Sequence, residues 1–418
     1  MPVVSLKGYA VLRNRNYRLF WLGQWISLIG TWMQSVTQAW LLARLTDNPL
    51  ALGVLGAASS APLLVFVLLG GLVSDRRDRR SLIIITQSLS LMQALVLAVL
   101  TLTGAVRPWH IIALAGMLGA INAFDIPARQ SFVVELVGPE LLPNAIALNS
   151  TGFNVARVLG PAIGGVLVAA VGEGICFLLN AISYLAVLWG LWLIRVEATA
   201  KSRARDGQRT GALQAGVRYV LERRELARIL LLIGAVSAVA VSYRAFLPAM
   251  ARTVLGVGAW RYGLLMAAAG VGAGTGGFFL AGQRLQVATY RRLLPISLLG
   301  FSVALSAFAL SRNYTASLFL LAGVGCGGLL YFNASNTLVQ LSVEDAIRGR
   351  VMSLYTLMHQ GTATFGSLVL GIVAERHGTP VALVSGAVFC LTAVTVFAAH
   401  SAFELRPGEE ATPVAGAD

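Results

Sequence analysis

Hydrophobic residues fall into long runs along the whole chain, and short polar or turn-forming segments separate the runs. A helix that crosses the hydrocarbon core of a bilayer needs roughly 20 mainly apolar residues, and about twelve runs of this length occur. Turn signals such as Asp47-Asn48-Pro49 and Gly378-Thr379-Pro380 separate them. The pattern predicts an all-α integral membrane protein. The predicted spans are 17–43, 50–73, 81–104, 108–126, 145–170, 174–195, 226–251, 258–281, 293–311, 314–338, 350–373 and 380–402.

The predicted spans form two sets of six on either side of one long polar stretch. This stretch contains the sequence KSRARDGQRTG and ends in an amphipathic segment. Several residues recur at one common spacing in both sets, for example Arg80 with Arg291 and Asn122 with Asn333. Such internal repeats are typical of transporters that bind substrate between their two halves. We therefore expect a six-helix bundle at 1–195, a cytoplasmic linker at 196–225, a second bundle at 226–403 and a cytoplasmic tail at 404–418.

The composition excludes the soluble classes of protein. Hydrophobic residues make up 57% of the chain and charged residues 12%, and the mean hydropathy is +0.75. A soluble domain has about 45–50% apolar and about 25% charged residues. Neither a soluble enzyme nor a nucleic-acid-binding protein fits these values.

The net charge of +14 is explained by membrane topology. When the N-terminus is placed in the cytoplasm, Lys and Arg favour the cytoplasmic segments roughly four to one, as the positive-inside rule requires. The distribution predicts a multi-pass membrane protein with both termini in the cytoplasm. No nucleic-acid partner is needed to account for the charge.

The sequence predicts no catalytic residue, no metal site and no cofactor. Its three cysteines lie in apolar runs without the spacing of a disulfide or metal site. Its two lysines, Lys7 and Lys201, are not in a phosphate-binding loop motif. We therefore expect a protein that is not an enzyme and that does not use ATP directly.

Two motifs carry a resemblance to a known family. The segment from Gly71 to Arg80, GLVSDRRDRR, resembles the G-x-x-x-D-R-x-x-R-R signature of the major facilitator superfamily. The segment from Gly160 to Gly165, GPAIGG, is similar to a G-P-x-x-G-G element of antiporters and exporters in that superfamily. Segments around Asp125 and Arg348 resemble a bacterial efflux branch that includes macrolide exporters and the enterobactin exporter.

The resemblance implies alternating access between two six-helix bundles and export of an amphipathic small molecule, such as a drug, macrolide or siderophore. Protons are the coupling ion that it implies, although the arginine that drug–proton antiporters often carry in mid fourth helix is absent from IIALAGMLGAINAFD. With this resemblance we expect a monomer in the lipid bilayer of the bacterial inner membrane. The alternatives are an importer or uniporter of a nutrient or lipid, and a membrane receptor that does not transport.

The first predicted helix carries one polar stripe. Its members recur every three or four residues, which places them on one face of a helix. A polar stripe facing lipid would be costly. It forms either hydrogen bonds between helices or the wall of a substrate cavity. The stripe consists of Gln24, Ser27, Thr31, Gln34 and Gln38.

Three ionisable residues lie inside other predicted spans. Arg157 lies near mid-depth of the fifth span, Arg244 nearer the outer end of the seventh, and His359 in the eleventh. A charge within a span indicates a functional site unless it pairs with a neighbouring helix. We interpret the three as candidate substrate-binding residues. Arg157 either binds an anionic substrate group or gates the proton of a carboxylate. The alternative for Arg244 is a side chain that snorkels to the outer surface, and His359 either titrates during transport or is a hydrogen-bonded histidine of a packed helix.

A further set of residues is expected to gate the conformational change. By resemblance, Asp75 faces the start of the eleventh helix near Arg350 and closes the cytoplasmic side, whereas charge-determined topology alone is the alternative. Asp125 and Arg129 have helical i,i+4 spacing, and either join that latch or pair with each other. The GPAIGG segment is a hinge or seal, or ordinary small-residue packing. The full set is Gly71, Asp75, Arg76, Arg79, Arg80, Asp125, Arg129, Gly160, Pro161, Gly164, Gly165 and Arg350.

Overall fold

The computed structural model describes residues 11–194, 210–280 and 286–404, and this part of the chain is helical without strands. The tail after 404 and the first part of the linker, 195–209, lie outside the described residues. Side chains at 67, 68, 75, 210–215, 345, 346 and 398–404 also lie outside them. The all-α prediction is therefore confirmed for the described ranges.

The N-terminal half consists of five helical elements, and side-chain caps mark the start of the first three. Asn48 caps α2 by accepting a hydrogen bond from the backbone N–H of Leu50, and Pro49 takes the first turn, where its missing N–H costs nothing. The turn predicted at Asp47-Asn48-Pro49 is therefore confirmed. The elements are α1 (Arg15–Leu45), α2 (Pro49–Arg76), α3 (Arg79–Leu102), α4 (Pro108–Val171) and α5 (Glu173–Leu193).

Helix α4 is 64 residues long and bends at Gly138. Gly138 has a φ of 68° and a ψ of 175°, a backbone conformation that a side chain would disfavour, and Pro139 follows it. At 1.5 Å per residue, 64 residues span about 96 Å, roughly three times a hydrocarbon core. The two arms of α4 thus correspond to the fourth and fifth predicted spans, and both arms extend farther toward the bend than those predictions.

The C-terminal half begins with the amphipathic helix α6 (Thr210–Glu222) of the predicted linker. Two of its long helices are interrupted by short segments of different winding. The run from Arg224 to Val254 contains a 3-10 turn and a π turn, and a π turn also separates α12 from α13. The elements are α7 (Arg224–Ala240), η2 (Ser242–Phe246), α8 (Leu247–Ala249), η3 (Met250–Val254), α9 (Ala259–Leu280), α10 (Val287–Leu310), α11 (Tyr314–Leu341), α12 (Asp345–Thr356), η4 (Leu357–Gly361), α13 (Thr362–His377) and α14 (Thr379–Glu404).

Ten helical segments of the described chain are long and apolar enough to cross a membrane. Helix α4 counts once among them, although its length suits two crossings, and α1 is not among them. At 31 residues α1 is long enough, but its polar stripe lowers its hydropathy. The prediction of a multi-pass membrane protein is confirmed, whereas the number of twelve spans stays a prediction.

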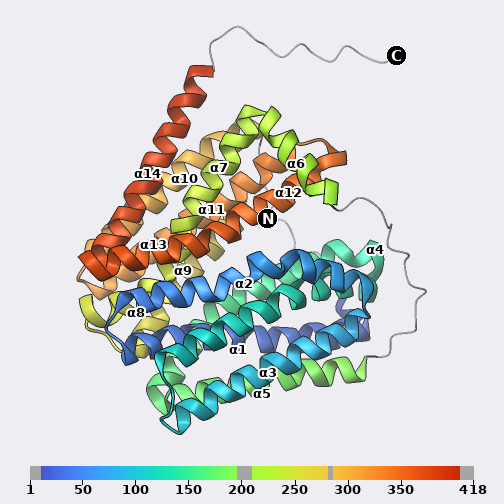
Figure 1. Ribbon diagram of the computed structural model, residues 1–418, viewed down its shortest axis with the longest axis vertical. Coiled ribbons are helices and arrows are strands. Elements are labelled where there is room, and N and C mark those ends of the chain that lie inside the picture. Colours follow the sequence, from blue (N-terminus) through green and yellow to red (C-terminus); the bar gives the residue numbers. More distant parts are fainter. Residues whose placement is uncertain (1–10, 195–209, 281–285, 405–418) are drawn as a thin grey trace.

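The two halves lie one above the other in Figure 1 and converge at one end. The convergent end, which we call the far end, carries the turns that join α1 to α2 and α13 to α14. The opposite end, which we call the linker end, carries α6 and the bend of α4, and there the halves diverge. The molecule therefore has a V shape that opens toward the linker.

Two pairs of helices make the most extensive contacts between the halves. Helix α2 packs against α13, and the second arm of α4 packs against α9. Both contacts are made at glycine: a Cβ atom added to Gly53 would lie 2.4 Å from the carbonyl oxygen of Ser367, and one added to Gly263 would lie 2.5 Å from that of Pro161. Backbones can approach this closely only without side chains. These two contacts, which we call the far-end seal, join the halves at the closed end of the V.

Candidate functional site

Two arginines from opposite halves approach each other where the halves meet. Arg157 lies on the second arm of α4 and Arg244 in η2, and both are half-buried. Their positive charges are close enough to repel each other. The backbone of α4 at Arg157 contacts α9 of the other half near Gly270. The arginines therefore form one cationic site between the halves.

No acidic side chain neutralises this site within the described part of the chain. The ion pairs of the structure involve other arginines, and Arg244 instead lies 5.8 Å from the centre of the Tyr243 ring. Bringing two like charges together inside a membrane protein without a counter-charge is costly. An anion held between the two guanidinium groups would remove both the repulsion and the missing counter-charge.

His359 adjoins the cationic site from the π turn η4. Its Nδ1 lies 3.1 Å from the hydroxyl oxygen of Ser237 on α7, and its ring contacts that of Phe332 on α11, with centroids 4.1 Å apart. The charge of Arg244 also acts on it. A π turn widens a helix locally and often occurs at functional sites. The structure thus brings together Arg157, Arg244 and His359, which are the three ionisable residues singled out within predicted spans.

Sequence reasoning missed the residues that contact Arg244 and His359 in this site. Tyr243 is buried beside Arg244, and its hydroxyl has no hydrogen-bond partner within the described residues. Ser237 and Phe332 contact His359 from two helices distant in sequence. Tyr243 precedes Arg244 directly, and that adjacency was the available signal. Nothing local marked Ser237 or Phe332.

The polar stripe of α1 lies mostly inside the N-terminal bundle. Gln34 donates a hydrogen bond to Gln93 of α3 (3.0 Å) and accepts one from Asn180 of α5 (2.8 Å). Gln38 donates to a backbone carbonyl of α4, and the hydroxyl of Thr31 lies 3.3 Å from that of Tyr184. These contacts, with Ser27 at 4% exposure, are the interhelical hydrogen bonds that were the alternative to a cavity wall. Gln24 differs from the other four residues of the stripe, because it lines a hollow between α1 and α4.

Asp125 and Arg129 pair with each other, as their spacing predicts. Their closest atoms are 2.6 Å apart, and Asp125, 2% exposed, accepts hydrogen bonds from Thr86 (2.7 Å) and Gln87 (3.0 Å) of α3. Arg129 also donates to Gln24 of α1 at 3.0 Å. The pair therefore ties three helices of one half together. Participation in a latch between the halves stays a prediction.

Replacement of Asp125 by Ala is expected to destabilise the protein by about 3–5 kcal/mol, because it leaves a largely buried guanidinium without its counter-charge. The measurement is the thermal midpoint of the purified protein in detergent. Asp47→Ala is the control, since the Asp47 side chain is 93% exposed. Equal midpoints for the two variants would contradict the role assigned to the pair.

The basic loop between α2 and α3 makes several contacts within the N-terminal half. Arg79 pairs with Glu135, and Arg80 donates to the backbone carbonyl of Leu191 at 2.7 Å. Partial burial acts to raise the pKa of Asp78, but hydrogen bonds with Ser81 and the charge of Arg80 outweigh it, and the pKa lies below its ordinary value. This end of α3 is therefore fixed by charge and by its cap.

The expected latch between Asp75 and the start of the eleventh helix stays a prediction. The Asp75 side chain lies outside the described residues. Arg76 is exposed, and a Cβ atom added to Gly71 would meet nothing within 4 Å. Arg350 lies against Gly216 of α6. Open space beside Gly71 agrees with the divergence of the halves at the linker end.

The GPAIGG segment packs against helices of both halves. Cβ atoms added to Gly160 and Gly164 would lie 2.4 Å from Trp32 and 3.1 Å from Met33, both on α1. One added to Gly165 would lie 2.8 Å from the carbonyl oxygen of Ala259 on α9. Its glycines thus serve close packing, and Pro161 and Gly165 belong to the far-end seal.

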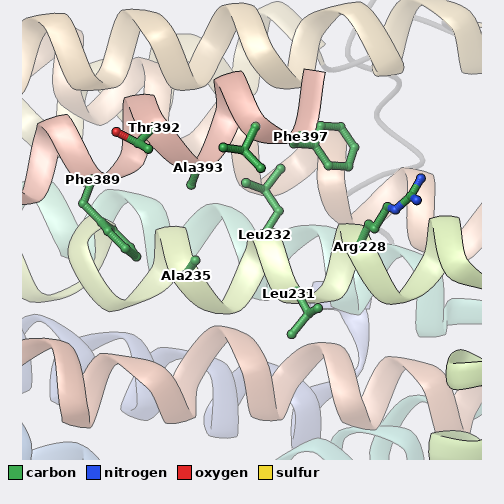
Figure 2. A pocket seen from close by; sticks show the side chains of 9 residues that line it. Arg228, Leu231, Leu232, Ala235, Phe389, Thr392, Ala393 and Phe397 are labelled. Atoms are coloured by element: carbon green, nitrogen blue, oxygen red, sulfur yellow. The ribbon is translucent and has the colours of Figure 1, made fainter. Parts of the chain in front are cut away.

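An apolar groove of about 390 Å³ lies between α7 and α14 (Figure 2). Leu232, Phe389 and Phe397 are among its lining side chains, with Arg228 toward one end. Apart from Arg228 and Thr392 its labelled side chains are apolar, so it suits hydrocarbon rather than a charged substrate. Within the described residues no cluster of His, Cys, Asp and Glu could hold a metal ion.

Comparison with known proteins gives the family. Residues 6–416 match the family described as "Transmembrane secretion effector". The chain is 23% identical to the staphyloferrin A transporter of Staphylococcus aureus (strain NCTC 8325 / PS 47), covering 91% of this chain and 95% of that one. It is 25% identical to the enterobactin exporter EntS of Salmonella choleraesuis (strain SC-B67), covering 96% and 95%.

Solved structures support the same fold. A bacterial homologue of the human lysosomal transporter Spinster, inward-facing and unoccupied, has a TM-score of 0.73 at 17% identity, with 94% of this chain and 99% of that chain covered. The nucleoside transporter NupG has a TM-score of 0.75 at 13% identity, with 92% and 98% covered. The fold is that of the transporters of the major facilitator superfamily.

Proposed function

Because the chain belongs to the transmembrane secretion effector family of the major facilitator superfamily, we propose that it exports an anionic, amphipathic small molecule of the siderophore class. Proton influx across the bacterial inner membrane drives the export. Arg157 and Arg244 bind the negatively charged group of the substrate. The observation that carries this proposal is the pair of arginines from opposite halves without an acidic partner in the described chain.

The V shape supports a cycle of alternating access. In this conformation the far-end seal is closed, and the halves diverge at the linker end. With the linker in the cytoplasm, this is an inward-facing state ready to accept substrate from inside the cell. An anion that binds Arg157 and Arg244 contacts both halves at once, so it favours a state in which they close around it.

His359 is the residue that we propose as the carrier of the coupling proton. It lies beside the cationic site and contacts both α7 and α11 through Ser237 and Phe332. A change in its charge would act directly on the arginines that bind the substrate. Gating by Asp75 and Arg350 at the linker end completes the proposed cycle.

The proposal is tested by efflux from bacteria that express the protein. Cells are loaded with a catecholate siderophore, a macrolide or a hydrophobic cation, and release is followed with and without a protonophore. We expect protonophore-sensitive release of the siderophore, reduced at least tenfold by Arg157→Gln at equal membrane levels. Release of the cation unaffected by Arg157→Gln would contradict an anion-binding site.

Import is the second candidate function, because transport direction depends on coupling as well as on the fold. The staphyloferrin A transporter is named without a direction, whereas the enterobactin protein is named an exporter. Protonophore-sensitive accumulation of the siderophore by intact cells would favour import.

A further inference from the structure

A second hollow, of about 330 Å³, lies within the N-terminal half, between α1 and the two arms of α4. It does not include Arg157, Arg244 or His359, so it is distinct from the cationic site. It is lined by Phe20, Trp21, Gln24, Trp25, Leu28, Ile126, Arg129, Gln130, Val133, Asn149, Gly152 and Phe153.

Aromatic rings form much of its wall. The rings of Trp21 and Trp25 are nearly parallel, with an interplanar angle of 8° and centroids 5.8 Å apart. Phe153, on the second arm of α4, is 45% exposed. Gly152 precedes it, and a Cβ atom added there would lie 3.1 Å from Cδ1 of Trp25. The missing side chain of Gly152 therefore keeps space open beside the indole of Trp25.

Three buried donors in this wall have no hydrogen-bond acceptor within the described residues. The Nε of Arg129 is one of them, but it is compensated by the ion pair with Asp125, which leaves two donors to explain. Arg129 donates to Oε1 of Gln24 at 3.0 Å, which fixes the amide orientation and leaves Nε2 of Gln24 unmatched. The indole Nε1 of Trp25 is unmatched as well. Leaving a buried donor unsatisfied is costly, and each instance in a folded protein calls for an explanation.

The volume and chemistry of the hollow define what it can hold. An apolar cavity of about 150 Å³ accepts a benzene ring, so about 330 Å³ leaves room for a substituted ring. Tryptophan faces favour stacking with aromatic groups. The free N–H groups of Gln24 and Trp25 require oxygen acceptors.

We propose that this hollow, which we call the aromatic subsite, binds an aromatic ring bearing phenolic or carboxylate oxygens, such as a catechol or hydroxybenzoate group of the substrate. The proposal rests on the proposed function, since it assigns one part of the transported molecule to α1 and α4 while the cationic site binds another. A substrate with both features is a catecholate or hydroxybenzoate conjugate rather than an aliphatic polycarboxylate.

The test is calorimetric titration of the purified, full-length protein in detergent with catechol. Trp25→Phe keeps an aromatic ring and removes the unmatched N–H. Trp21→Phe is the matched control, because it makes the same change in the stacked partner, whose N–H is not among the buried unmatched donors. We expect Trp25→Phe to weaken catechol binding at least fivefold more than Trp21→Phe, and Gly152→Val to abolish it by filling the space beside Trp25.

A parallel titration with citrate separates this proposal from the proposed function. Arg157→Gln should weaken citrate binding at least tenfold and leave catechol binding within twofold. Equal effects of Trp25→Phe and Trp21→Phe, or no catechol binding at millimolar concentration, would mean that the hollow holds only water and would overturn the aromatic subsite. Citrate binding unchanged by Arg157→Gln would instead overturn the role of the cationic site.

Discussion

Arg157→Gln is expected to weaken binding of an anionic substrate by at least about 30-fold, with retention of the fold. Truncating one partner of a buried, hydrogen-bonded charge pair costs about 2–5 kcal/mol, and about 1.4 kcal/mol corresponds to a factor of ten. Arg244→Gln should have a similar effect, because both guanidinium groups contact the same anion in the proposed site. Arg157→Lys should recover part of the affinity, since it keeps the charge and loses the two-pronged geometry.

The melting behaviour of Arg157→Gln distinguishes binding from a structural role. Without substrate, Arg157 and Arg244 repel each other, so removal of one charge should leave the thermal midpoint unchanged or raise it. A structural arginine would lower it. Arg376→Gln is the control, since it removes one positive charge from an exposed position near the end of α13. A lower midpoint for Arg157→Gln with undiminished anion binding would contradict the site.

Gly263→Ala is expected to open the far-end seal and reduce transport by about tenfold or more. The added Cβ would lie 2.5 Å from the carbonyl oxygen of Pro161 and 2.8 Å from Cα of Gly165. Both atoms belong to backbone, so α4 and α9 must separate. Overpacking costs about 1–3 kcal/mol, which is a factor of roughly five to 150 in the equilibrium between the two states.

The opening can be measured as a distance between spin labels in a variant without native cysteines. Thr103→Cys and Arg312→Cys place labels at exposed far-end positions of the two halves. Gly263→Ala should lengthen this distance, whereas Gly274→Ala on the same helix should not, because a Cβ atom there meets nothing within 4 Å. An unchanged distance with normal transport would contradict the role of Gly263 in the far-end seal.

Helices and turns were accessible from the sequence because their causes are local. Runs of apolar residues gave the spans, and Asn48 with Pro49 marked a helix start that the structure confirms. Gly138 and Pro139 mark the bend of α4, but the prediction did not use them and placed the polar gap more widely than the structure does. Local sequence patterns therefore predict that a helix forms more accurately than they predict where the helix ends.

The partners of the polar and charged residues depend on tertiary packing. The spacing of Gln34 and Gln38 shows that they share a face of α1, but not that α3, α4 and α5 lie against that face. Similarly, Arg157 and Arg244 were each recognisable as charges within spans. Their proximity arises from how the two halves dock, which no local pattern encodes.

The most direct test of the central claim is transport into inside-out membrane vesicles with an acidified lumen. Accumulation of a labelled catecholate siderophore that stops on addition of a protonophore, falls at least tenfold in Arg157→Gln and persists in Arg376→Gln is the result we predict. Accumulation that is equal in wild type and Arg157→Gln, or that occurs only in right-side-out vesicles, would contradict proton-driven export of an anion through the cationic site.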